Sequence, residues 1–580
     1  CFLNDGQGRF RDVSAEAGTT GSEGSTSMTL ADVDGNGTLD LYIANYRTDD
    51  VRDRGQVRFR MIQGRPVLPG SETNRFALKE GRLEEFGQAD RLLLNDGKGR
   101  FREVSWSGGA FLDADGRPLT EPPRDWGLMA AFRDLNGDGA PDLYVCNDYW
   151  TPDRLWWNDG QGRFRAAGPQ ALRHLSASSM SVDFSDVDRD GDIDFFVVDM
   201  LSRDPVIRKR QKDAQPPPPP GIGVGDDAPQ HSHNTLFLSR GDGTFAEVAH
   251  WANVPATDWS WAPLFLDVDL DGYDDLVVGA GHFRDVQDFD AEADVQSRQH
   301  SWEAVRNDAE RQRLFTQELL EHYRLYPLLQ LPIAGFRNRG DGRFEEMTSA
   351  WGLAIPGVHQ GIVSADFDGD GDLDLAVNRL NAPALLLENT GGGPRIAVRL
   401  RGRAPNTGAI GARVTLHTEG QPSQQREIMA GGRYLSSCDA EVAFAGGDAR
   451  ASRRLEVRWR SGAVTVVPQV GLQRRYVIEE PEPTPGPRAA SPSAPAAAAA
   501  VPWFRDASAS LAHIHTEVPY DERSRQPLAP YRLRQMGPGV AWVDFNGDGQ
   551  DDLAVGAARG QALALFAGDR SEEHTPELQS

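Results

Sequence analysis

A nine-residue acidic pattern occurs six times in this chain, and its residue types are those of a calcium-binding loop. The copies are residues 32–40, 134–142, 186–194, 267–275, 366–374 and 544–552. Asp stands at positions 1 and 9 of every copy, Asp or Asn at positions 3 and 5, and Gly at position 6. Ca²⁺ takes about six to eight oxygen ligands, which a loop with an oxygen at every second residue and a sharp Gly turn supplies.

Positions 1, 3, 5 and 9 are expected to bind the ion through side-chain oxygens. Position 7 varies between copies, as expected if it binds through its backbone carbonyl. The predicted ligands are Asp32, Asp34, Asn36, Thr38 and Asp40; Asp134, Asn136, Asp138, Ala140 and Asp142; Asp186, Asp188, Asp190, Asp192 and Asp194; Asp267, Asp269, Asp271, Tyr273 and Asp275; Asp366, Asp368, Asp370, Asp372 and Asp374; and Asp544, Asn546, Asp548, Gln550 and Asp552.

The residues after each loop distinguish it from an EF-hand, which needs Glu at position 12 and a helix on each side. Positions 10 and 12 are apolar in every copy, and position 12 is always Ile or Val. Apolar residues two apart predict a half-buried strand that leaves the loop. Acidic turns that bind no ion are the alternative.

A second repeat lies beside these loops. Residues 3–13, 94–104, 157–165, 238–248 and 337–347 each read as a strand, a Gly-rich hairpin turn and a second strand that opens with Phe. A strand, an acidic loop, a strand and such a hairpin give four short antiparallel strands, which is one blade of a β-propeller.

These units resemble FG-GAP/VCBS repeats, the calcium-bearing blades of integrin α-chain heads and of many bacterial surface proteins. The resemblance covers most of residues 1–390 and again 503–568. It implies an all-β fold: a calcium-binding β-propeller of about seven blades, or six as the alternative, then a small β-rich domain and the start of a second propeller. The implied cofactor is about one Ca²⁺ per loop.

Residues 395–480 lack acidic loops and predict strands at 396–400, 412–416, 426–429, 455–459 and 464–467. Segments 406–416, 425–437 and 455–464 resemble the ASPIC/UnbV domain, which follows such propellers in cartilage acidic protein and its bacterial relatives. Two short segments depart from the family pattern, at Asn406-Thr407-Gly408 and Phe444-Ala445-Gly446-Gly447.

The expected domains are a propeller truncated at its N-terminus (1–394), an ASPIC/UnbV-like domain (395–480), a Pro/Ala-rich linker (481–502) and a truncated second propeller (503–569). Residues 570–580 resemble a translated sequencing adapter, and we expect them to form no strand. Because the chain starts at Cys1 inside a repeat unit, we expect a longer parent whose signal peptide lies upstream.

Charge and motifs narrow the function. A net charge of −25 argues against nucleic acid as a partner, and no apolar run is long enough to span a membrane. No P-loop, G-x-S-x-G elbow or H-E-x-x-H helix occurs. The sequence therefore predicts a non-catalytic binding or adhesion module at a bacterial surface, with a protein or glycan ligand. A calcium-dependent glycan hydrolase or lyase, or a lectin, is the alternative.

Calcium also predicts location, because weak loops of this kind fill where Ca²⁺ is near millimolar. We therefore expect the protein outside the cytoplasm: extracellular, periplasmic or at the cell surface. Loops 186–194, 267–275 and 366–374 carry Asp at positions 1, 3, 5 and 9, whereas the other three replace one Asp with Asn. The all-Asp loops should bind Ca²⁺ more tightly.

Other segments carry weaker signals. Residues 45–90 and 200–233 read as irregular insertions, and 285–329 as mostly helix. The pairs His231/His233 and His513/His515 could ligate a metal from a strand, although such pairs are more often simply solvated.

Overall fold

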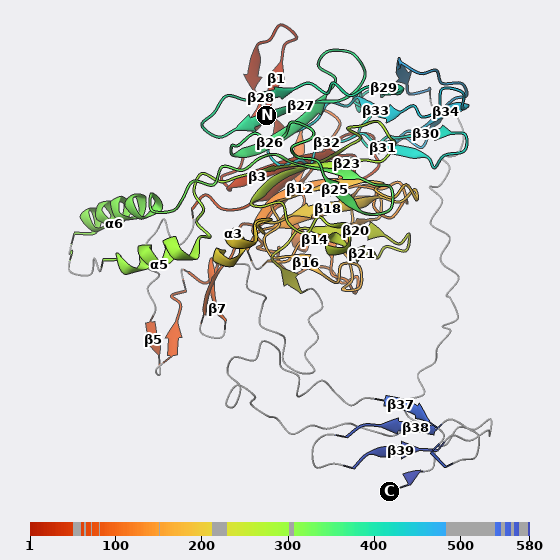
Figure 1. The fold of residues 1–580 in the computed structure, drawn as a ribbon. Helices are drawn as coiled ribbons and strands as arrows, with labels where there is room; N and C mark the ends of the chain where they lie inside the picture. Colours follow the sequence, from red (N-terminus) through yellow and green to blue (C-terminus); the bar gives the residue numbers. More distant parts are fainter. Residues whose placement is uncertain are drawn as a thin grey trace. The chain divides into compact units, whose positions relative to one another are not determined.

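A computed structural model describes residues 1–49, 60–62, 65–70, 72–79, 82–149, 151–211, 229–300, 305, 307–482, 540–543, 545–546, 552–557, 562–567 and 578–579. The chain forms two compact units, Cys1–Ala494 and Pro495–Ser580. Strands dominate both, as the all-β prediction requires (Figure 1).

Four antiparallel sheets of the first unit contain the predicted blade: two strands around an acidic loop, then a hairpin. A fifth sheet holds three such strands, and a hairpin of β1 (Phe2–Asn4) and β2 (Phe10–Asp12) precedes them all. In chain order the five blades are β3 (Ser25–Ala31), β4 (Asp40–Asn45), β9 (Arg91–Asn95) and β10 (Phe101–Glu103); β12 (Gly127–Arg133), β13 (Asp142–Asn147), β14 (Arg154–Asn158) and β15 (Phe164–Ala166); β17 (Ser181–Ser185), β18 (Asp194–Val198), β20 (Thr235–Ser239) and β21 (Phe245–Glu247); β22 (Ser260–Leu266), β23 (Asp275–Ala280), β24 (Ala334–Asn338) and β25 (Phe344–Glu346); and β26 (His359–Ala365), β27 (Asp374–Arg379) and β28 (Leu385–Leu387).

The first strands of successive blades lie next to one another in the order β3, β12, β17, β22 and β26. This is the arrangement of a β-propeller, and it agrees with the predicted fold class. The described residues show no closed ring, so the count of seven blades stays a prediction.

The strand after the acidic loop was predicted to be half-buried, and this is wrong for the middle blades. Every residue of β13, β18 and β23 is buried. The reason is that neighbouring blades cover both faces of each sheet, so both sets of alternating side chains enter a core. The acidic loops therefore stand on buried strands.

Residues 45–90 were predicted to be irregular, which is wrong in part, because residues 60–62 pair with 65–67 and residues 76–79 with 82–85 as short antiparallel strands. The other insertions agree better with the sequence. Segment 285–329 forms α5 (Phe289–Ser297) and α6 (Asp308–Tyr323), which confirms the helical prediction. Segment 200–233 holds α3 (Pro205–Arg210), and its proline run lies outside the described residues. The remaining short elements are α1 (Ser14–Ala17), β5 (Arg60–Ile62), β6 (Arg65–Val67), β7 (Phe76–Lys79), β8 (Arg82–Glu85), η1 (Trp106–Gly108), β11 (Phe111–Leu112), β16 (Leu175–Ser176), β19 (Gln230–His231) and α4 (Ala249–Ala252).

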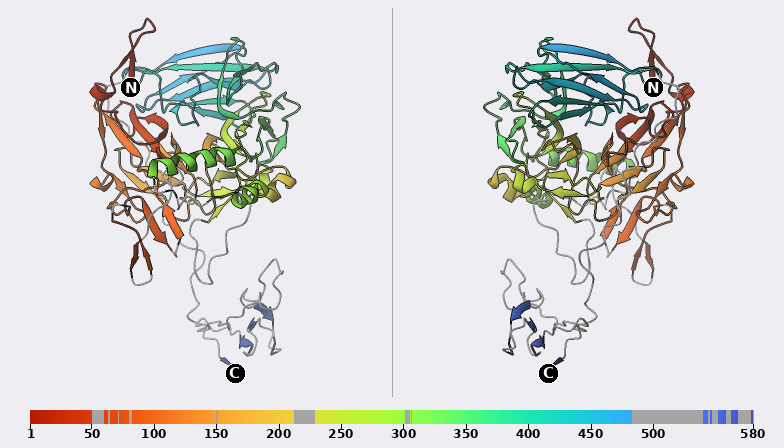
Figure 2. Two further views of the ribbon diagram at one scale, coloured as in Figure 1. Left: turned by 90° about the vertical axis from the view of Figure 1, so that its left-hand side faces the viewer. Right: turned by 90° about the vertical axis from the view of Figure 1, so that its right-hand side faces the viewer.

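Residues 395–480 form two packed sheets around their own apolar core, and Figure 2 shows them in cyan to blue. We call this part the C-terminal module. The five predicted strands are present, and β33 and β36 were missed. The first sheet holds β33 (Val442–Ala445), β29 (Arg395–Arg401) and β36 (Arg474–Glu479); the second holds β31 (Gln424–Glu427), β30 (Arg413–Thr418), β34 (Arg453–Arg458) and β35 (Val464–Val467).

Segment 430–438 of the module leaves its sheets and runs along the first strands of the blades. Its short strand β32 (Ala430–Gly431) pairs with β3 of the first blade. Arg433 then forms a 2.6 Å ion pair with Asp183 of β17, which is fully buried. Tyr434 stacks on Trp261 of β22 with ring centroids 5.1 Å apart.

One further hydrogen bond and one close backbone approach also hold segment 430–438 against the blades. Ser364 of β26 donates its backbone N–H to Cys438 Sγ at 3.4 Å. Gly431 has φ +72°, and a Cβ there would lie 2.3 Å from the Met28 carbonyl oxygen, so a larger residue does not fit. Segment 430–438 therefore joins strands from separate blades.

The second unit contains one four-stranded antiparallel sheet: β37 (Val540–Val543), β38 (Asp552–Val555), β39 (Ala564–Phe566) and β40 (Leu578–Gln579). The prediction that residues 570–580 carry no strand is wrong, because β40 pairs with β39. Edge pairing needs only backbone N–H and C=O groups, so an atypical sequence can still supply it. The adapter origin of this segment stays a prediction. Among the described residues no helix is long and apolar enough to cross a bilayer.

Candidate metal centres

Each described acidic loop is held in shape by its own side chains. The position-5 oxygen accepts the backbone N–H of position 7 in all five loops, at 2.7–3.1 Å. In the first four loops the position-1 carboxylate accepts the N–H of the position-6 glycine, at 2.8–3.3 Å. These are Asx-type turns, in which a short polar side chain replaces a backbone partner. The side-chain oxygens are thereby fixed before any ion arrives.

The position-9 Asp has a structural role of its own. Asp40 Oδ2 accepts the N–H of Val33 at 3.0 Å, and its Oδ1 accepts the N–H of Asn95 at 2.8 Å. The same two bonds recur in the other four described loops at 2.8–3.0 Å. Position 9 therefore ties the loop to the following hairpin, so its invariance alone does not require an ion.

The carboxylates nonetheless converge as a metal site requires. In four loops, ligand atoms from three Asp residues lie within 4.8 Å of one another. The groups are Asp32, Asp34 and Asp40; Asp186, Asp188 and Asp194; Asp267, Asp269 and Asp271; and Asp366, Asp368 and Asp374. The loop at 134–142 has Asn136 at position 3, so one of its predicted ligands is an amide. All-oxygen sets of this kind suit hard cations.

Unpartnered buried oxygens mark where an ion would fit. Asp32 Oδ1, Asp134 Oδ1 and Asp372 Oδ1 are buried without a hydrogen-bond partner. A buried carboxylate oxygen without a partner costs free energy that a bound cation would recover. The residues present therefore fit a divalent cation.

The raised pKa values of the loop carboxyls also show that their charged forms are disfavoured without a cation. Burial raises the pKa of Asp40 to about 7, of Asp194 to about 8 and of Asp275 to about 9. Burial likewise raises the pKa of Asp186 to about 6 and of Asp267 to about 7, and neighbouring Asp charges add to it. A cation favours the charged form, so binding would restore ordinary ionisation in the loop.

The C-terminal module reaches all five described loops, which the sequence did not predict. Arg460 donates to the Asp32 carbonyl at 2.8 Å, Arg413 to Asp134 Oδ2 at 3.0 Å, and Gln425 to Asp186 Oδ2 at 3.1 Å. Arg426 pairs with Asp274, and Arg475 lies 2.7 Å from Asp366 Oδ2. No spacing rule in the sequence connects these module residues with loops hundreds of residues away. The one available signal was the Arg-rich composition of 395–480.

Position 7 carries side-chain contacts that the carbonyl interpretation ignored. Thr38 donates its hydroxyl to Asn36 Oδ1, and Arg189 lies over the ring of Tyr273 at 4.9 Å. Arg395 Nη1 lies 3.1 Å from Asp372 Oδ2. The carbonyl role itself stays a prediction.

The sixth loop falls mostly outside the described residues. Asp544, Asp548 and Gln550 lie there, whereas Asn546 is exposed and Asp552 begins β38. A strand therefore follows this loop, as in the other copies. His513 and His515 also lie outside the described residues.

Known families match the propeller, the C-terminal module and the second unit of the chain. Residues 1–43, 134–197, 223–278 and 332–377 match the FG-GAP-like repeat, and residues 536–568 match the FG-GAP repeat. Residues 402–485 match the family described as ASPIC and UnbV.

Comparison with curated proteins gives no match. Among solved structures, rhamnogalacturonan lyase YesW is similar at 12% sequence identity with a TM-score of 0.22, covering 64% of this chain. The chain spans 61% of that lyase's length. At that TM-score the likeness carries no functional argument.

Proposed function

For an FG-GAP repeat protein that carries an ASPIC and UnbV domain, we propose a calcium-stabilised binding module that acts outside the cytoplasm. Its propeller would present a protein or glycan ligand with a surface whose shape depends on bound Ca²⁺. Adhesion at a bacterial surface is the role we assign to it.

The observation that carries this proposal is the converging set of Asp oxygens in the acidic loops, together with buried oxygens that lack partners. Oxygen-only ligands favour Ca²⁺ over metals that prefer nitrogen or sulfur. The loops connect buried strands, so an ion bound in a loop would stabilise the packing of those strands within the blade. Extracellular Ca²⁺ near millimolar suits weak loops of this type, which supports a location outside the cytoplasm.

A binding role is supported by the small size of one cavity that the acidic loops border. That cavity lies between the module and the propeller and measures about 110 Å³. Sites for small molecules are usually about 300–1,000 Å³, so a sugar chain would not enter it. Asp267, Asp274, Arg426 and Arg433 line it. Arg426 pairs with Asp274, and Arg433 pairs with Asp183 of β17.

Calcium removal is the most direct test of the metal assignment. If each site has a Kd of ~0.1 mM, ~1 mM Ca²⁺ stabilises the folded state by about 1.4 kcal/mol per site, or about 7 kcal/mol for five sites. Thermal melting of the full chain in EDTA and in ~1 mM Ca²⁺ should therefore give clearly different midpoints. Identical midpoints would mean that the loops are turns without ions.

Ligand binding needs a separate measurement. The full chain, immobilised on beads, should retain a glycan from an array or a protein from a surface extract in Ca²⁺ and release it in EDTA. Equal retention of the ligand in Ca²⁺ and in EDTA would contradict a calcium-dependent binding surface. The metal would then have a structural role only.

A further inference from the structure

Four histidines from separate segments come together on the third blade, away from the acidic loops. His174 lies just before β16 and His231 ends β19, and these two strands pair in parallel. His233 follows two residues later, and His250 lies in α4. The sequence offered only His231 and His233. The other two imidazoles are brought in by the fold.

Two ring nitrogens face each other at the centre of this cluster. His174 Nε2 lies 2.8 Å from His233 Nε2. The other ring nitrogen of His233, Nδ1, lies 2.6 Å from the carbonyl oxygen of Asn234. A carbonyl only accepts, so Nδ1 carries the proton and Nε2 of His233 presents a lone pair. An imidazole held in this way by a backbone carbonyl is the usual arrangement of a metal-binding histidine.

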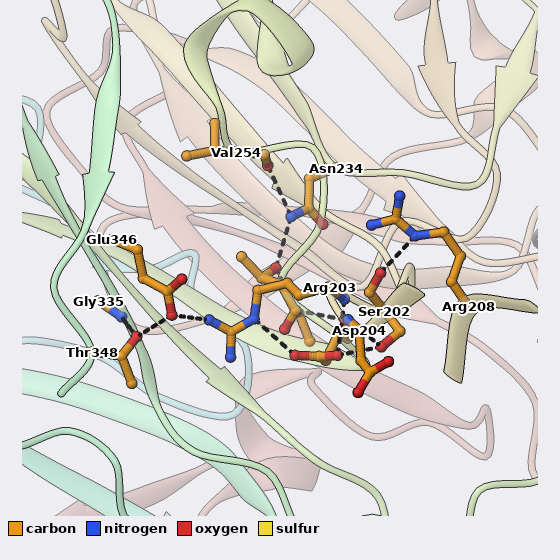
Figure 3. A network of polar contacts seen from close by, with 12 residues as sticks. Ser202, Arg203, Asp204, Arg208, Asn234, Val254, Gly335, Glu346 and Thr348 are labelled. Atoms are coloured by element: carbon orange, nitrogen blue, oxygen red, sulfur yellow. Dashed lines mark hydrogen bonds and ion pairs between the residues drawn. The ribbon is translucent and has the colours of Figure 1, made fainter. Parts of the chain in front are cut away.

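The carbonyl that orients His233 belongs to a residue that is itself fixed. Asn234 is fully buried, and its side chain donates to Val254 O at 3.2 Å and to Thr257 Oγ1 at 2.7 Å. Figure 3 shows Asn234 between Val254 and the polar network around Arg203. Its Oδ1 also accepts the backbone N–H of Asp199 at 2.8 Å. His233 is therefore positioned by a rigid second layer.

The other two rings lie against this pair. His231 stacks on His174 with centroids 4.1 Å apart, and His250 meets His233 edge-on at 4.7 Å. His233 is buried, whereas His250 is exposed and His174 and His231 are half-buried. The cluster is thus open to solvent at His250, and the ring nitrogens of His174 and His233 are the two that converge in this structure.

The two histidines whose ring nitrogens face each other, His174 and His233, are uncharged at neutral pH. Burial lowers the pKa of both His174 and His233 to about 4, and for His174 the neighbouring imidazoles lower it further. Neutral imidazole is the form that binds metals.

A hydrogen bond between the two imidazoles would also explain the 2.8 Å distance between His174 Nε2 and His233 Nε2. Two nitrogens at about 2.0–2.1 Å from a tetrahedral Zn²⁺ lie about 3.3 Å apart, so metal binding needs the pair to open by about half an ångström. What the hydrogen bond does not explain is the gathering of two more imidazoles around it.

We propose that His174 and His233, together with His231 and His250, bind a divalent cation that prefers imidazole, for which Zn²⁺ is the probe. Ca²⁺ prefers carboxylate and carbonyl oxygens, whereas imidazole suits Zn²⁺, Cu²⁺ and Ni²⁺. The molecule would then hold hard cations in its loops and a softer cation in the third blade. This site is independent of the function proposed above.

The test is zinc titration of the full chain by calorimetry with ~1 mM Ca²⁺ present, so that the acidic loops are filled with Ca²⁺. We expect one zinc site that weakens strongly in the double variant His174→Asn/His233→Asn. Losing a ligand should cost more than the about 10–100-fold that losing a second-layer partner costs. The matched control is His417→Asn, which removes an imidazole on β30 and should leave zinc binding unchanged.

Zinc X-ray absorption gives a second readout that does not depend on the variants. Imidazole nitrogens at about 2.0–2.1 Å should dominate the first shell. An oxygen-only shell would place the zinc in the acidic loops and overturn the proposal, and so would equal zinc affinity in parent and double variant. If the double variant melts much lower than the parent in Ca²⁺, the single variants His231→Asn and His250→Asn replace it. At least one of them must weaken zinc binding for the proposal to stand.

Discussion

Two acidic loops have the same predicted ligands and different surroundings. Residues 186–194 and 366–374 both carry Asp at positions 1, 3, 5, 7 and 9. In the structure, Arg395 pairs with Asp370 and Asp372 of the second loop, and Arg475 pairs with Asp366. Among the described residues, no such ion pair reaches the five Asp residues of the first loop. There, Gln425 contributes a neutral amide to Asp186.

This difference between the two loops shows that the number of Asp ligands in the sequence does not give the net charge around a bound ion. Two guanidinium groups offset much of the negative charge in loop 366–374, and they occupy oxygens that an ion would use. Arg337 does the same to Asp269 and Asp271 in loop 267–275. We therefore expect loop 186–194 to bind Ca²⁺ most tightly, although the sequence ranks these three loops as equal.

The largest expected effect comes from removing the guanidinium of Arg395, which reaches loop 366–374 from β29. Arg395→Gln leaves Asp372, whose side chain is 1% exposed, without its charged neighbour. Breaking a buried pair in this way typically costs about 3–5 kcal/mol. Denaturant unfolding in EDTA should show that loss, and Ca²⁺ should recover most of it. A loss of the same size with and without Ca²⁺ would mean that the ion and Arg395 do not share these oxygens.

The next effect separates the two loops directly. The variants Asp188→Asn/Asp190→Asn and Asp368→Asn/Asp370→Asn remove two charges while keeping the side-chain shape. At Ca²⁺ 100-fold above Kd a site contributes about 2.7 kcal/mol, and at 10-fold about 1.4 kcal/mol. The first variant should therefore lose more Ca²⁺-dependent stability, measured as unfolding free energy in Ca²⁺ minus that in EDTA. If the two variants lose equal Ca²⁺-dependent stability, the arginines do not make the two loops differ in Ca²⁺ affinity.

A smaller effect should follow from making the first loop resemble the second. Gln425→Arg would bring a guanidinium to Asp186, a positive charge that competes with Ca²⁺ for the same carboxylate. Calorimetry should show a severalfold weaker Ca²⁺ affinity at one site, with the others unchanged. Gln425→Glu is the matched control and should not weaken binding.

The smallest effect concerns the first loop of the chain, where Asn36 stands at position 5. Asn36→Asp adds one ligand charge, and the Asp side chain can still accept the Thr38 N–H that Asn36 accepts at 2.7 Å. We expect Ca²⁺ affinity at this loop to rise by a few-fold at most, because Arg460 lies 3.7 Å from Asp32 Oδ2. Calcium titration of the variant against the parent would measure it.

Local pattern was enough to predict the blades, the loops and most of the module. Residues 464–467 were predicted as a strand and form β35, and the alternation around the hairpins set the others within a few residues. These signals are local, because a strand and its turn are encoded by neighbours in the chain.

Contacts between distant segments could not be predicted in this way. Arg413 and Asp134 are far apart in sequence, and nothing in either segment specifies the other. The same holds for His174 and His250, which no motif connects with His231 and His233. Full burial of β18 was missed because an alternating pattern does not reveal that a second blade covers the other face.

The pairing of β3 with β32 has a consequence for how the chain is made. Thr29 donates its hydroxyl to the carbonyl of Ala430, 401 residues later. A ribosome makes the first blade long before it makes the strand that completes its edge, and domains generally fold in order of synthesis. Until segment 430–438 has been translated, the first strands of the blades lack their common partner. The propeller therefore reaches its final packing only after synthesis of the module.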